Sequence, residues 1–326
     1  DLKNYTGAHA IPIMNGTAAL HLCLYMAGVK HGEDVFVQDL TFVATANAVS
    51  YCGAQPHFVD VEKETFSIDP IKLREYLNAE FGIEDAGVRH KKTGRLTRAL
   101  ILTHIFGHPA KINEIQKICS DFNLILIEDA AEGLGSYYND RHVGTFGKFA
   151  ALSFNGNKTI TTGGGGALLT MDDEMAIKAK HLSTTAKVAN AYLHTHDEVG
   201  FNYRMPNINA ALGCAQMENL DGYLAKKKKL AAAYEDIFEG FNDIEFVKQP
   251  ESCLSNFWLN NIIFADENQK REFMDYLASQ GIYCRGLWAN MSSLPMYATM
   301  PKMELSVSSD LCSRTVSLPS SPFLID

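Results

Sequence analysis

Ser153-Phe154-Asn155-Gly156-Asn157-Lys158-Thr159-Ile160-Thr161-Thr162, followed by four glycines at 163–166, is the stretch from which the rest of the chain can be interpreted. An apolar strand predicted over residues 149–154 leads into it, so Lys158 is expected between a strand end and a glycine-rich turn. An amine held in a dry pocket there is nucleophilic and can form a Schiff base with a carbonyl compound. The alternative is a solvated surface lysine, because most lysines are exposed.

A carboxylate follows a second predicted strand. Asp129 lies in Ile127-Glu128-Asp129-Ala130-Ala131-Glu132, directly after an apolar run over 124–127. Ligands bind at the carboxyl ends of strands in open α/β sheets, and the two alanines would let a flat ring approach. An aspartate there could pair with the protonated ring nitrogen of pyridoxal phosphate and keep that ring an electron acceptor. The alternative is that Asp129 caps a following helix.

A third segment predicts an anion site. Asn15-Gly16-Thr17-Ala18-Ala19-Leu20 lies between an apolar strand over 10–14 and a helical stretch over 21–27. The first amides of a helix are free to bind an anion, and phosphate is the expected guest. The alternative is an ordinary capped helix, with Asn15 or Thr17 as the cap.

Apolar strands alternate with helical stretches through the first two thirds of the chain, which predicts an α/β sheet with helices on both faces. The predicted strands cover 35–37, 56–61, 100–103 and 124–127, and the helices between them include 71–80 and 112–122, with another helix at 207–220.

The character of the chain changes at residue 221, where we expect a long helix over 221–238. A strand over 257–264, a helix over 269–280 and a strand over 282–288 follow it. We therefore predict a large mixed-sheet α/β domain over 1–220 and a small C-terminal α+β domain over 221–326. We interpret the charge run 226–229 as a solvated face rather than an anion site, because neighbouring helical residues point in different directions.

Composition excludes several classes of function. The chain has 326 residues, a net charge of −9 and 46% hydrophobic residues, which argues against generic nucleic-acid binding and favours a sizeable core. Its seven cysteines show no CxxC spacing, so we expect reduced thiols in a cytoplasmic protein. We expect no membrane span, because no apolar run approaches the required length of roughly 20 residues, and no metal site, because no ligand cluster is apparent.

Together these segments resemble the DegT/DnrJ/EryC1/StrS sugar aminotransferases, a branch of the fold-type I enzymes that use pyridoxal phosphate. The resemblance extends over nearly the whole chain. It rests on residues 16–20, 41–47, 59–61, 128–131, 153–158 and 200–205. Within the family, residues 155–162 and 196–200 look like the LegC-type enzymes of legionaminic acid and related amino-sugar pathways.

The resemblance implies a role for each site residue. Lys158 would carry the cofactor and later relay the proton, and Asp129 would pair with the pyridine nitrogen. Phe42 would stack on the ring, although a core aromatic is the alternative. Glu132 stands where many relatives carry glutamine or histidine against the ring hydroxyl, so it is expected near the cofactor with an unassigned role.

The resemblance also implies how phosphate and substrate are held, in a homodimer whose active sites are shared between subunits. Arg204 would reach the substrate-facing rim of the neighbouring subunit's site, and Asn202 would reach its phosphate. The remaining phosphate-binding residues would be Gly16, Thr17, Ala18 and Ser153.

The expected activity is transfer of an amino group from L-glutamate to C4 of a nucleotide-linked 4-keto-6-deoxy sugar. A UDP-linked N-acetyl hexosulose is our choice of substrate, and a GDP-linked sugar is the alternative. A sugar dehydratase of the same fold is one rival, but the resemblance implies histidine in place of the lysine in those enzymes, and this chain has Lys158. A non-catalytic regulator is the other rival, and it would need neither Lys158 nor Asp129.

Overall fold

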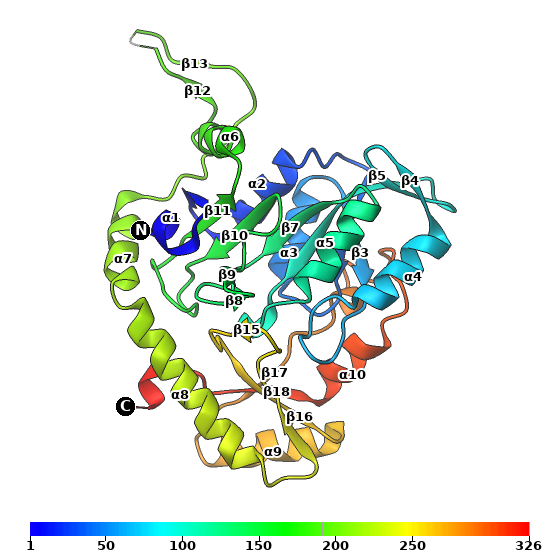
Figure 1. Cartoon of the computed structure of the whole chain (residues 1–326), viewed down its shortest axis with the longest axis vertical. Helices are drawn as coiled ribbons and strands as arrows, with labels where there is room; N and C mark the ends of the chain where they lie inside the picture. The colour runs from blue at the N-terminus through cyan, green and yellow to red at the C-terminus, as the bar shows by residue number, and fades with distance from the viewer. Residues whose placement is uncertain (191, 326) are drawn as a thin grey trace.

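The computed structural model describes residues 1–190 and 192–325 and contains a nine-stranded mixed sheet (Figure 1). The strand order is β1-β11-β10-β7-β6-β2-β3, with β5 added beside β6 and β4 beside β5. Neighbours from β10 to β3 run parallel, and the other pairs are antiparallel. The strands are β1 (His9–Ile13), β2 (Asp34–Gln38), β3 (Gln55–Val59), β4 (Phe81–Glu84), β5 (Gly87–His90), β6 (Leu96–Thr103), β7 (Ile125–Asp129), β10 (Phe149–Ser153) and β11 (Gly166–Thr170).

Helices cover both faces of this sheet, because each central strand is apolar on both sides. On β7, Leu126 belongs to one core cluster and Ile127 to the other. Helices α4 and α5 pack on the first cluster, and α2, α3 and α6 pack on the second. This buried, mostly parallel arrangement explains why the strands read as continuous apolar runs. The helices are α2 (Gly16–Met26), α3 (Val43–Tyr51), α4 (Pro70–Glu80), α5 (Ile112–Asp121) and α6 (Asp173–Ser183).

The last third of the chain forms an antiparallel sheet in the order β14-β16-β18-β17, in the lower part of Figure 1. Side chains of α8 and α9 pack with this sheet in a core of its own. A further apolar cluster joins the two parts, and Phe106 and Trp258 lie in it. The elements are α8 (Leu220–Phe238), β14 (Ile244–Phe246), β16 (Asn260–Phe264), α9 (Glu267–Ser279), β17 (Arg285–Gly286), α10 (Ser306–Arg314) and β18 (Thr315–Leu318).

The remaining elements are short or lie at the surface. The hairpin of β12 and β13 extends away from the body of the molecule (Figure 1), and α7 has no buried residue. Among the described residues, no helix is long and apolar enough to cross a membrane. These elements are α1 (Leu2–Thr6), η1 (Ile105–Gly107), β8 (Tyr137–Tyr138), β9 (Arg141–His142), β12 (Lys187–Val188), β13 (Thr195–His196), α7 (Asn207–Met217), β15 (Cys253–Leu254), η2 (Met291–Ser293) and η3 (Pro322–Leu324).

The structure corrects two expectations in the C-terminal third. The strand predicted over 282–288 is reduced to two paired residues, because β17 meets β18 only at Arg285 and Gly286. The charge run over 226–229 is not uniformly solvated, because Lys227 is buried at 4% exposure. Helix α8 contributes Leu220 to the large core and Ala231 to the small one, so it joins both parts. The domain boundary at 220/221 stays a prediction.

Candidate active site

A cavity of about 290 Å³ opens at the carboxyl ends of β7 and β10 and the start of α2. This is the edge at which parallel sheets place ligand sites. Most of the predicted site residues line it, and Trp258 and Trp288 close it from the C-terminal part of the chain. The predicted residues in its wall are Gly16, Thr17, Phe42, Asp129, Glu132, Ser153 and Lys158.

Lys158 lies in the turn after β10 with its side chain 11% exposed. Its Nζ is 3.2 Å from Glu132 Oε1 and 3.9 Å from the centroid of the Trp258 ring. A carboxylate and an aromatic face both attract an ammonium group. The alternative of a solvated surface lysine is therefore wrong.

Glu132 is buried and connects the lysine to the η1 loop. Its Oε2 accepts a hydrogen bond of 2.7 Å from the amide of Phe106, while Oε1 faces Lys158. Burial raises the pKa of Glu132 above its ordinary value, and nearby Asp129 adds to this, although Lys158 and the Phe106 amide oppose it.

Asp129 is the last residue of β7 and is 4% exposed. Thr45 Oγ1 donates a 2.6 Å hydrogen bond to Asp129 Oδ2, and the Ala131 amide donates a 3.2 Å bond to Oδ1. A turn rather than a helix follows, so the alternative of a helix cap is wrong. The carboxylate is fixed in orientation by Thr45, which reaches it from α3.

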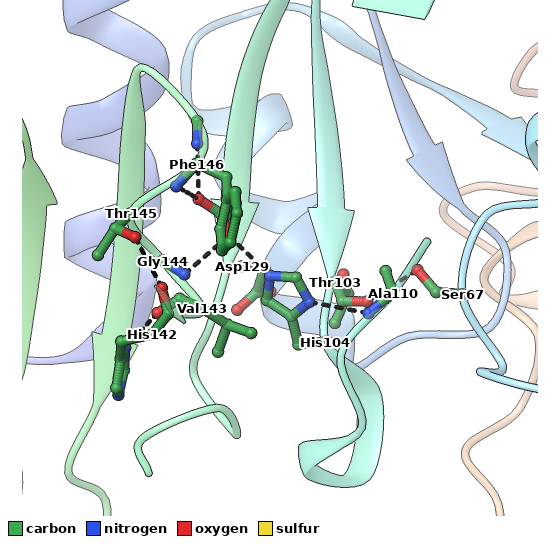
Figure 2. A network of polar contacts seen from close by, with 12 residues as sticks. Ser67, Thr103, His104, Ala110, Asp129, His142, Val143, Gly144, Thr145 and Phe146 are labelled. Carbon is green, nitrogen blue, oxygen red and sulfur yellow. Dashed lines mark hydrogen bonds and ion pairs between the residues drawn. The ribbon is translucent and has the colours of Figure 1, made fainter. Parts of the chain in front are cut away.

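A second buried carboxylate, that of Glu128, lies next to Asp129 on β7 and stabilises the end of this strand. Glu128 accepts hydrogen bonds from the His104 ring and from the amides of Gly144, Phe146 and Gly147. Burial alone would raise the pKa of Glu128, but the His104 ring and the amides lower it below its ordinary value. Figure 2 shows His104 between the end of β7 and the Ala110 amide, which donates to its Nδ1. This network holds the loops around Asp129 in one arrangement.

The start of α2 is pressed against the end of β10. A Cβ on Gly16 would lie 2.9 Å from Ser153 Cβ, so only glycine allows this approach. Asn15 caps the helix, as one of the two alternatives predicted, and its Oδ1 accepts the Ala18 amide at 2.8 Å. The Ala18 amide is therefore already bonded, and Ala18 lies outside the cavity wall, whereas Thr17 and Ser153 face the cavity.

Aromatic side chains form the opposite wall. Phe42 is 48% exposed, so the alternative of a core aromatic is wrong. Its ring meets Trp288 edge-on at 5.9 Å, and Trp288 in turn stacks with Phe106 at 5.6 Å and with Trp258 at 6.3 Å. A flat apolar ligand would find ring faces and edges on this side.

Asn202 and Arg204 are exposed and lie outside the cavity of their own chain. Each is held by a single β-bridge, Asn202 with Thr184 and Arg204 with Ile13. Within this chain the structure does not bring them to Lys158.

Sequence reasoning missed three residues of this site. Thr45 lay inside the stretch 41–47 that carries the family resemblance, and a hydroxyl in the first turn of α3 was the available signal. Trp258 and Trp288 are the two tryptophans of the chain, but no local pattern shows that they fold back onto the cavity.

The assembled groups define what can bind. A shielded amine can attack an aldehyde, a fixed carboxylate can pair with a cationic ring nitrogen, and a helix start beside a hydroxyl can hold an anion. Lys158, Asp129 and the pair of Thr17 and Ser153 supply these three functions within one cavity.

Comparisons with known proteins agree with this chemistry. The model of the DegT/DnrJ/EryC1/StrS aminotransferase family matches residues 1–326. The GDP-perosamine synthase of Escherichia coli O157:H7 is 33% identical over 97% of this chain and 81% of its own length.

Two solved structures share the fold closely. An aminotransferase of this family from Brucella abortus superposes with a TM-score of 0.90 at 28% identity, over 100% of this chain and 84% of that one. DesV of S. venezuelae, solved in complex with a ketimine intermediate, gives a TM-score of 0.87 at 26% identity, over 99% and 82% of the two chains. The predicted fold class is confirmed. This chain belongs to the DegT/DnrJ/EryC1/StrS family and is a pyridoxal phosphate-dependent aminotransferase.

Proposed function

We propose that this aminotransferase moves the amino group of L-glutamate to C4 of a nucleotide-linked 4-keto-6-deoxy sugar, in the synthesis of an amino sugar of the legionaminic acid type. The observation that carries the proposal is the shielded amine of Lys158, 3.2 Å from Glu132 in the cavity that also contains Asp129. A UDP-linked N-acetyl hexosulose is the substrate we propose. A GDP-linked sugar is the second candidate, because a relative at 33% identity is a GDP-perosamine synthase.

The residues of the cavity fit pyridoxal phosphate, which supplies an electron-accepting ring when bound. Asp129, oriented by Thr45, would keep the ring nitrogen protonated. Thr17 and Ser153 would hold the phosphate where the Gly16 backbone meets β10 at close range. Phe42 would cover a ring face. Since the Ala18 amide is bonded to Asn15, we assign the phosphate to the amides of residues 16 and 17 rather than to Ala18.

Lys158 would move the protons of both half-reactions. Its Nζ would take the proton from Cα of glutamate in the first half-reaction, and it would deliver a proton to C4 of the sugar in the second. Glu132, 3.2 Å from Nζ, would hold the amine in its resting position. The two carboxylates would thus have separate roles: Asp129 would pair with the ring nitrogen, and Glu132 contacts the amine.

We propose a homodimer in which Asn202 and Arg204 serve the neighbouring site. Their exposure outside their own cavity supports this, as does α7, whose Ile208 is 81% exposed and whose residues are not buried in the single chain. A second copy would cover this apolar face. A cytoplasmic location is proposed because all seven cysteines are free.

The absorbance spectrum of the purified protein tests the proposal. We expect a band at roughly 410–430 nm from the lysine Schiff base, which L-glutamate shifts towards roughly 330 nm. Lys158→Ala should remove the band and the turnover while the circular dichroism spectrum is retained. Full transaminase activity in that variant would refute the assignment. Addition of UDP-linked and then GDP-linked 4-keto sugars to the glutamate-treated enzyme would show which one restores the original band.

A further inference from the structure

Lys227 is a buried lysine on α8, next to two exposed lysines, Lys228 and Lys229. It is 4% exposed, whereas Lys228 beside it is exposed. Its Nζ donates hydrogen bonds to the carbonyl oxygen of Ser320 at 2.7 Å and to that of Trp258 at 3.1 Å. A buried ammonium is costly to keep and is retained only where hydrogen bonds compensate. Burial also lowers the pKa of Lys227 to about 8.

Trp258 is held at three further points. Its amide donates to Asn256 Oδ1 at 2.8 Å, and its indole Nε1 donates to the Asn157 carbonyl at 2.7 Å. Its ring is 3.9 Å from the Nζ of Lys158. Backbone and ring are therefore both fixed, and the ring face is directed at the active-site amine.

We propose that Trp258 is a positioning residue for the Lys158 amine. Lys227 is a second positioning residue, because its ammonium group holds the backbone carbonyl of Trp258. An aromatic face attracts an ammonium group and shields it from water. The ring thereby keeps Nζ beside Glu132. Through Lys227, α8 and the C-terminal segment at Ser320 become part of the support of the active site.

This positioning role matters for catalysis only if Lys158 has the proposed function. The contact between Trp258 and Lys158 can be tested without cofactor. The cofactor-free full chain is treated with trinitrobenzenesulfonate, and modification of Lys158 is followed by mass spectrometry relative to exposed Lys178. Trp258→Leu should speed modification of Lys158 by about 2- to 30-fold, the range expected from loss of a cation–π contact. Trp258→Phe, which keeps an aromatic face, should lie closer to the wild type.

Lys227→Met keeps the length of the side chain and removes both hydrogen bonds, so it should also speed modification of Lys158. Lys228→Met, on the same helix but exposed, is the matched control and should have no effect. Lys227→Arg keeps donors at this position and should restore most of the protection.

Two results would overturn the proposal. An unchanged Lys158 rate in Trp258→Leu removes the role of the tryptophan. Equal rates in Lys227→Met and Lys228→Met, with near-ultraviolet circular dichroism unchanged, remove the role of Lys227. If Lys227→Met does not fold, Lys227→Leu, which also lacks a donor, replaces it and is judged by the same comparison. An enzyme that lacks the glutamate-dependent spectral shift but shows the expected rates would refute the proposed function alone.

Discussion

The side chain of Asn256 ties the segment before β16 to the loop that carries Glu132. Its Nδ2 donates to the carbonyl of Glu132 at 2.6 Å and to that of Leu134 at 2.8 Å, and its Oδ1 accepts the Trp258 amide at 2.8 Å. The side chain is 2% exposed. Asn256→Ala would leave three buried backbone groups without these partners.

The expected loss in the free energy of unfolding follows from the number of hydrogen bonds that Asn256 makes. The net contribution of a hydrogen bond is about 0.5–1.5 kcal/mol, but removing one partner leaves a buried group unpaired, which costs about 1–3 kcal/mol unless water replaces the partner. For three bonds, with partial access of water to the space left, we expect the free energy of unfolding to fall by about 3–5 kcal/mol. Since Glu132 and Trp258 both lose an anchor, cofactor binding should weaken as well.

Urea unfolding followed by circular dichroism and by tryptophan fluorescence measures this loss from the shift in midpoint. Ser255→Ala is the matched control, because the Ser255 hydroxyl also makes two hydrogen bonds, to Gly107 and Phe257, but is half-buried and open to water. We expect a loss of about 1 kcal/mol for it. The reasoning fails if Asn256→Ala loses no more stability than Ser255→Ala.

Two further changes have defined outcomes. Gly16→Ala should weaken binding of pyridoxal phosphate in an absorbance titration, because the added Cβ would lie 2.9 Å from Ser153 Cβ. Gly222→Ala is the control and should not weaken binding, because its added Cβ meets no atom within 4 Å. Equal affinities of the two variants would contradict the packing argument. Burial lowers the pKa of His108 to about 4, and its ring nitrogens lack hydrogen-bond partners among the described residues. The unfolded chain therefore protonates this ring more readily than the folded chain. The free energy of unfolding should fall by about 3 kcal/mol as pH drops from about 6.5 to 4. Urea midpoints of His108→Leu should show a correspondingly smaller pH dependence, and an identical one would refute it.

Local sequence predicted six of the nine strands of the large sheet, because these strands are long apolar runs, whereas β11 was missed although it is buried throughout. The run over 124–127 became β7, and the run over 149–154 became β10. The prediction was poorer where a strand is short and pairs on one edge, as at 282–288, because two paired residues leave little pattern. The hairpin of β4 and β5 was also missed, because β4 is exposed over three of its four residues and so has no apolar pattern.

The burial of Lys227 could have been predicted in part. It shares a helix face with the buried residues Leu230 and Ala231, three and four positions further on. Helical spacing therefore indicated an inward-facing position, but the lysine itself indicated a solvated one. Which of the two prevails depends on acceptors such as the Ser320 carbonyl, 93 residues away along the chain.

The sequence by itself determined the positions at which strands end and the residue types placed there. Lys158, Asp129 and Gly16 each follow a predicted strand, and strands that run in the same direction bring such ends to one edge of a sheet. Only the tertiary structure decided which groups touch them. Thr45 reaches Asp129 from α3, and Trp258 covers Lys158 from the C-terminal part, because these contacts depend on how separate elements pack together and not on any local pattern.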